Sequence, residues 1–220
     1  MIRKNPILLL AGVVCLVAFI STNQPLAAPK AKPARKTTAL SYHDAWREAW
    51  EEHIKWTRGV IVAFLDSNPC VTNYEARLLQ NPGDMANLLR PYYGDTAANT
   101  FSNLVYQHLV IAVEILAAAK SGDTNGVATA SAAWYQNAQD IANLMATLNS
   151  RCWPAGEMYT MWKQHLDATL SEAVSHLTHD CTTEVTAFDT IETLALEMAD
   201  TFSDCIIEHF HNRFSSTPKF

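Results

Sequence analysis

The chain has 220 residues, with 16 lysines and arginines against 22 aspartates and glutamates. The first 40 positions hold six basic residues and no acidic residue, so residues 41–220 carry 10 positive and 22 negative charges. A folded body this acidic excludes the basic face that nucleic-acid binding requires, and it is long enough for one domain with a hydrophobic core.

The first 28 residues are typical of a secretory signal peptide. Arg3 and Lys4 precede an unbroken run of 14 apolar or Gly residues, Ile7–Ile20, and residues 26–28 (LAA) are small enough for cleavage. The run is shorter than the about 20 residues of a membrane span, although an uncleaved anchor is the alternative. Residues 29–40, rich in Pro, Ala and Lys, are predicted to form a basic flexible tether. We therefore expect a periplasmic or secreted protein with no stable membrane span after cleavage.

Almost everything after residue 40 has the periodicity of amphipathic helices. In the first long helix, predicted over residues 42–66, inward positions from Trp46 to Phe64 recur at alternating spacings of four and three. Two short helical pieces follow before a turn at residues 91–94 (PYYG). Four more long helices are predicted over residues 96–120, 127–149, 155–177 and 183–211. Short connections favour antiparallel neighbours, so we predict one all-α, up-down antiparallel bundle of four to five long helices over residues 41–220. Segments of similar sequence in the first four long helices leave open whether the bundle arose by duplication of a helical hairpin.

Four of these helices carry a polar residue where the apolar seam should continue. A tryptophan stands three residues earlier on three helices, and a valine does so on the fourth. The pairs are Trp50 and His53, Val105 and His108, Trp134 and Asn137, and Trp162 and His165. At a similar level, these polar groups would form a layer of three imidazoles and one amide. Three histidines with an open fourth position are a known arrangement for catalytic zinc.

The polar layer has several interpretations. It can hold a divalent transition metal such as zinc, or a small ligand, with Trp50, Trp134 and Trp162 lining a pocket. Thr57 and Thr169 each follow a histidine by four residues, and they are expected either to support the imidazoles or to bond the carbonyl one turn back. Asn137 is a poor ligand for such metals and is expected to orient water or an imidazole.

Binding is the leading predicted function. A metal-dependent enzyme using three histidines plus water is the alternative, as is a structural or interaction bundle whose polar layer only fixes packing. Catalytic motifs such as G-x-S-x-G and Gly-rich phosphate loops are absent from the sequence. The sequence leaves the oligomeric state open.

An ion pair follows from the expected antiparallel register. Glu114 is the only acid in the apolar stretch 109–116. If the first two long helices align at their histidines, Glu114 lies opposite Arg47, and the two are predicted to form a structural ion pair.

The cysteines indicate a disulfide. Four remain after signal cleavage, and an even count in an exported protein is typical of disulfide bonding. The first and third long helices are expected to run in the same direction, which places Cys70 and Cys152 at the same end of the bundle. We therefore predict a Cys70–Cys152 disulfide, with Cys181 unpaired or intermolecular.

Three further motifs stand out: the W-x-x-H-x-x-W-T-R segment from Trp50 to Arg58, the PYYG turn, and the H-L-x-I-A segment from His108 to Ala112. With these motifs, residues 44–205 resemble an uncharacterised family of small bacterial and archaeal helical-bundle proteins. The resemblance implies a helical fold and a shared polar pattern, and it carries no activity.

Overall fold

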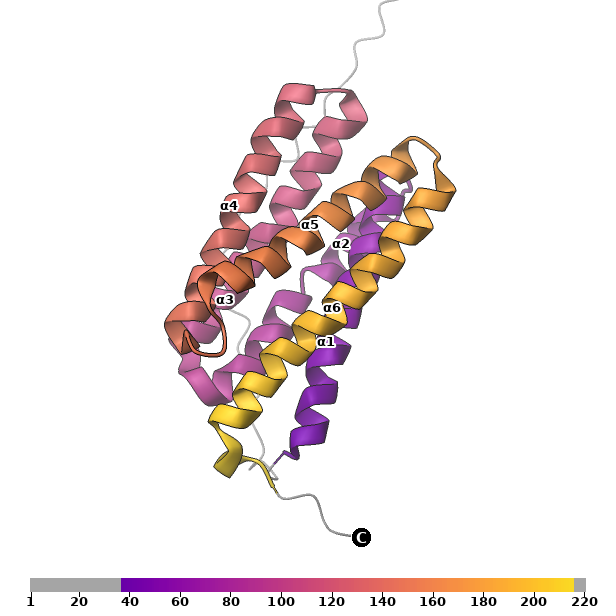
Figure 1. Cartoon of the computed structure of the whole chain (residues 1–220). Coiled ribbons are helices and arrows are strands. Elements are labelled where there is room, and N and C mark those ends of the chain that lie inside the picture. The colour runs from indigo at the N-terminus through magenta and orange to yellow at the C-terminus, as the bar shows by residue number, and fades with distance from the viewer. Residues whose placement is uncertain (1–36, 216–220) are drawn as a thin grey trace, which may run out of the picture. The chain divides into compact units, whose positions relative to one another are not determined.

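The computed structural model describes residues 37–215, which form a bundle of helices (Figure 1). The signal peptide and most of the tether predicted from the sequence lie outside the described residues. The helices are α1 (Ala39–Leu65), α2 (Val71–Leu78), α3 (Asn81–Ser121), α4 (Thr124–Asn149), α5 (Ala155–Leu177) and α6 (Cys181–His209), followed by a short 3-10 turn, η1 (His211–Arg213). No strand is formed between residues 37 and 215, so the predicted all-α bundle is confirmed.

The first helix begins earlier than the sequence predicted. The side chain of Thr38 accepts a hydrogen bond from the backbone N–H of Ser41, which caps α1 at Ala39. Two residues assigned to the tether are therefore helical. A backbone bridge between Thr38 and Ser215 brings the two ends of the described chain together.

Helix α3 consists of two helical halves that meet at Gly94. This residue has φ 81° and ψ 175°, a conformation open almost only to glycine. The first half, residues 81–93, runs back along α1, because the Tyr42 hydroxyl donates to the carbonyl of Leu88 while Asn81 contacts Ala49. The second half, residues 95–121, then runs forward beside α1. The predicted turn at residues 91–94 thus exists, with the break at its glycine.

From the second half of α3 onward the helices alternate in direction, and the second half of α3 is parallel to α1. At one end of this pair, Lys120 donates to the carbonyl of Phe64. Helix α5 also runs parallel to α1, since Trp162 contacts Trp50 and His176 contacts Asp66. Helices α4 and α6 run the opposite way. These directions arise because α2 and the first half of α3 together form one antiparallel element between α1 and the second half of α3.

The core lies where α1, α3, α5 and α6 meet. Its centre is built from large aromatic side chains that are fully buried: Trp46, Trp50, Phe101, Trp162 and Phe202. Trp46 and Phe202 stack with ring centroids 5.2 Å apart, which docks α6 across α1. Burying such side chains is worth about 1.5–3 kcal/mol each, so this aromatic centre supplies much of the drive for folding.

Within the described residues, one helical stretch between Val71 and Ser121 is long and apolar enough to cross a membrane. It includes the second half of α3, which contributes Val105, Leu109 and Ile115 to the interior of the bundle. Core helices of globular domains commonly have this composition, so length and hydropathy alone do not show that this stretch crosses a membrane.

Candidate metal centre

Three parallel helices each place one histidine at the same height in the core. His53 comes from α1, His108 from α3 and His165 from α5, and each is exposed by 2% or less. Their ring centroids are 5.8–6.5 Å apart. The convergence that the seam spacing predicted is therefore present in the structure.

The three imidazoles are close enough to share one ion. One ring nitrogen from each lies within 4.8 Å of the other two. Dividing 4.8 Å by the square root of three shows that some point lies within about 2.8 Å of all three nitrogens. Zinc–nitrogen bonds are about 2.0–2.1 Å long, so closing the site needs a movement of less than about 1 Å per ring.

A hydrogen bond to the amide oxygen of Asn81 fixes the tautomer of His53. The amide nitrogen of Asn81 donates to the carbonyl of Ala49 at 2.8 Å, which turns its oxygen toward Nδ1 of His53 at 2.9 Å. An amide oxygen only accepts, so Nδ1 of His53 carries the proton and donates. Nε2 of His53 is left with a lone pair for a ligand, as in metal sites whose histidines are held by a second partner.

Asn137 does the same for His108. Its amide nitrogen donates to the carbonyl of Leu104 at 3.0 Å, and its oxygen lies 3.3 Å from Nδ1 of His108. The predicted polar residue of α4 therefore orients an imidazole and is not itself a ligand. The sequence pattern found Asn137 because it lies on a helical seam, but it missed Asn81.

Asn81 had no comparable signal. It is 1% exposed and stands at the very start of α3, where the sequence Asn-Pro-Gly separates the two short helical pieces predicted before residue 91. An asparagine before a proline is a common turn residue, and its side chain has no periodic position from which burial could be inferred. Only the return of the chain along α1 brings it to His53.

His165 is the least constrained of the three. Its Nδ1 is buried and has no hydrogen-bond partner among the described residues. No second side chain fixes its tautomer, so the ring can offer either nitrogen. A ligand shared with His53 and His108 would provide this imidazole with the polar contact that it otherwise lacks.

Burial keeps all three histidines uncharged. Loss of solvent lowers the pKa of His53 to about 4, against a weaker opposing effect of Asn81. Desolvation, and then the charge of His53, lower the pKa of His165 to about 3. The pKa of His108 falls well below its usual value for the same reasons. Metal binding needs neutral imidazoles, and this site supplies them throughout the physiological pH range.

Two tryptophans close one face of the layer, and a third packs against its other face. Trp50 and Trp162 precede His53 and His165 by three residues, and both are fully buried. The Trp50 ring contacts His165 and the Trp162 ring contacts His108, with centroids 5.9 and 5.3 Å apart. Trp134 stacks on His108 at 5.0 Å, and its indole N–H donates to the His108 carbonyl at 2.9 Å. The predicted aromatic lining therefore surrounds the histidines.

The two threonines do not contact the imidazoles through their hydroxyls. Thr57 donates to the carbonyl of His53 at 2.7 Å, and Thr169 donates to the carbonyl of His165 at 2.8 Å. Of the two roles expected for them, the structure has the bond to the carbonyl one turn back. The role of supporting an imidazole belongs to Asn81 and Asn137.

The predicted ion pair between Arg47 and Glu114 is wrong. Arg47 donates to both carboxylate oxygens of Asp200 on α6, and Glu114 is exposed. The prediction assumed that the helices of His53 and His108 are antiparallel. Because they are parallel, Glu114 lies beyond one side of the histidine layer and Arg47 beyond the other.

The predicted Cys70–Cys152 disulfide is also wrong. The four cysteines among the described residues are free thiols. Cys70 follows α1, whereas Cys152 follows the oppositely directed α4 and lies at the other end of the bundle. There the amide nitrogen of Asn149 is 3.4 Å from the sulfur of Cys152 and 3.3 Å from that of Cys205.

Comparison with known proteins adds no assignment. No protein-family model matches the chain, and no curated protein or solved structure is significantly similar to it. The resemblance to an uncharacterised helical family stays a prediction. The class of molecule that fold and geometry define is an all-α bundle with three buried histidines that could hold a metal ion.

Proposed function

We propose that this chain is an exported binding protein that holds one divalent transition metal ion, zinc in the first instance, between His53, His108 and His165. The single observation that carries the proposal is the pair of amides behind the layer. Asn81 and Asn137 are each anchored to a backbone carbonyl, and each presents its oxygen to Nδ1 of a histidine. This arrangement leaves Nε2 of both histidines with a lone pair for a ligand.

A hydrogen-bond network without a ligand accounts for the layer less well. His53 and His108 each use the Nδ1 proton in a hydrogen bond to an amide oxygen, so their Nε2 atoms can only accept. His165 has one proton and can satisfy at most one of them. In the structure Nδ1 of His165 is a buried polar atom without a hydrogen-bond partner, at a cost of about 1–3 kcal/mol, whereas one cation would be shared by all three rings. A buried water molecule is the competing occupant, and metal analysis separates the two.

The ligand set favours zinc or a similar ion. Imidazole suits Zn, Cu, Fe and Ni, while Mg and Ca prefer oxygen ligands. The group of candidate ligands contains three histidines and no carboxylate or thiol among the described residues. Three nitrogens with one open position fit the tetrahedral preference of zinc.

The direct test is the metal content of protein purified without a histidine tag. We expect about one equivalent of zinc after dialysis against zinc, and its loss in His108→Ala. The matched control is His209→Ala, which removes an exposed histidine near the end of α6 and should leave zinc unchanged. Circular dichroism checks that each variant is folded. A folded wild-type protein that takes up no zinc, cobalt, copper or iron would overturn the proposal.

An enzyme using metal-bound water is the second candidate. Three neutral ligands leave the double charge of the ion uncompensated in the core, which favours hydroxide at the fourth position. Zinc can lower the pKa of its bound water to about 7. We expect such an enzyme to hydrolyse an activated ester with a rate that rises through this pH range. Equal rates for zinc-loaded wild type and His108→Ala in the same zinc concentration would exclude it.

Export is the remaining part of the proposal, and it is supported by the sequence of residues 1–28 alone. The basic start, the apolar run and the small residues at 26–28 favour cleavage after Ala28. N-terminal sequencing of the protein from a bacterial periplasmic fraction should begin at Pro29. An intact Met1 on protein recovered from the cytoplasm would contradict export.

A further inference from the structure

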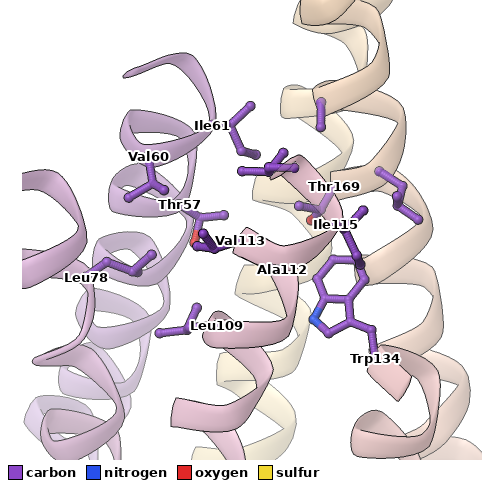
Figure 2. Close-up of a pocket in the computed structure, with 13 residues that line it drawn as sticks. Thr57, Val60, Ile61, Leu78, Leu109, Ala112, Val113, Ile115, Trp134 and Thr169 are labelled. Atoms are coloured by element: carbon purple, nitrogen blue, oxygen red, sulfur yellow. The ribbon is translucent and has the colours of Figure 1, made fainter. Parts of the chain in front are cut away.

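An apolar cavity of about 30 Å³ lies next to the histidine layer. Figure 2 shows side chains of α1, α3, α4 and α5 facing a common space, with Leu78 of α2 at its edge. The lining residues on α1 and α3 include Val60, Ile61, Leu109, Val113, Ile115 and Leu116. Trp134 is part of this lining, whereas Trp50 and Trp162 lie on the opposite side of the layer.

Its position follows from the parallel helices. Thr57, Ala112 and Thr169 all line the cavity, and each follows one of the three histidines by four residues. Since α1, the second half of α3 and α5 run in the same direction, these residues lie on the same side of the layer. One helical turn is about 5.4 Å, so the cavity begins about one turn from the imidazoles.

The chemistry of the lining favours an apolar occupant over water. Its polar groups are two threonine hydroxyls and one indole, and all three donate to backbone carbonyls, those of His53, His165 and His108. The hydroxyl oxygens can still accept, but no donor is left for a water molecule, which needs two to four polar partners when buried, and largely apolar cavities take up apolar guests.

The opposite side of the layer has no such space. Trp50 and Trp162 fill it, both fully buried and both in ring contact with the histidines. Beyond them Phe202 is stacked against Trp50. Of these two sides of the layer, the side of the apolar cavity is therefore the one with room for a fourth ligand of an ion.

We propose that this cavity binds one small uncharged apolar molecule of a few heavy atoms, and that it delivers this molecule to the open face of the metal. The first half of the proposal concerns the cavity alone, and the second half rests on the proposed metal site. A volume of about 30 Å³ exceeds the 10–15 Å³ that one water-sized probe occupies, so a molecule the size of dissolved dioxygen fits.

Xenon is the probe for the cavity. In metal-free protein, dissolved xenon should shift the methyl NMR signals of Ile115 and Leu116, which line the cavity. Ala112→Leu fills the space and should weaken these shifts at least tenfold. The matched control, Ala117→Leu, makes the same change at an exposed position of α3 and should keep them. Val113→Thr, which keeps the size but adds a hydroxyl, should also weaken xenon binding and serves if Ala112→Leu does not fold.

The second measurement tests the link to the metal. Cobalt in place of zinc should strongly broaden the signal of bound xenon, because a paramagnetic ion one helical turn away relaxes it. Xenon shifts that are absent in wild type, or unchanged in the cavity-filling variants, would overturn the cavity proposal. Xenon that binds without any effect of bound cobalt would overturn delivery to the metal. Failure of the protein to take up cobalt would instead overturn the proposed function, while the metal-free xenon result would stand.

Discussion

Removing the amide behind His53 tests the metal site most sharply. Asn81→Ala deletes the acceptor 2.9 Å from Nδ1 of His53 and the donor 2.8 Å from the carbonyl of Ala49. Both partners are buried and lose their only side-chain contact of this kind. The Ala49 carbonyl keeps its hydrogen bond within α1, so only Nδ1 of His53 is left unpaired, and the free energy of unfolding should fall by about 1–3 kcal/mol.

The same change should weaken metal binding. Loss of a partner that orients a ligating histidine typically lowers metal affinity by about 10–100-fold. Asn137→Ala should have a smaller effect, because the corresponding distance to His108 is 3.3 Å. Asn81→Asp keeps an acceptor for His53 and adds a negative charge near the ion, so it should retain more affinity than Asn81→Ala.

The assay is competition for zinc with a chromophoric chelator, combined with urea denaturation of the metal-free proteins. Asn87→Ala is the matched control, since Asn87 is an exposed asparagine in the same half of α3. Zinc affinities within twofold of wild type for both Asn81→Ala and Asn137→Ala, in folded protein, would refute the role assigned to the two amides.

Three other outcomes follow from the structure. Burial lowers the pKa of His53 to about 4, below the 6.5 of an unfolded chain, so the unfolded state takes up the proton first as pH falls. The metal-free protein should therefore lose about 3 kcal/mol through this one group between pH 6.5 and pH 4, and urea midpoints that stay constant over this range would contradict it. Oxidised glutathione, which accepts the two electrons and two protons of a thiol pair, should link Cys152 to Cys205, and peptide mapping that finds any other intramolecular pair would show that the thiols are not neighbours. Gly94→Ala should lower stability by about 1–3 kcal/mol because φ is 81° at this position. Gly83→Ala, in a helix with open space around the glycine, should raise stability slightly. Equal thermal midpoints for the two variants would argue against the sharp reversal in α3.

The sequence predicted those parts of the structure that depend on neighbours along one helix. The alternating spacing from Trp46 to Phe64 placed His53 inside α1, and the same pattern found His108, Asn137 and His165 on their helices. A helical face is set by residues three and four positions apart, so burial could be inferred before any partner helix was known.

The tertiary structure decided which helices face each other and in which direction. The return of residues 71–93 along α1 makes three histidine-bearing helices parallel, brings Asn81 to His53, and sends Cys70 and Cys152 to opposite ends. The same reversal separates Arg47 from Glu114 and opens the apolar cavity on one side of the layer. Contacts between distant segments depend on how the chain between them folds, and this depends on one glycine conformation and on packing that no local spacing records.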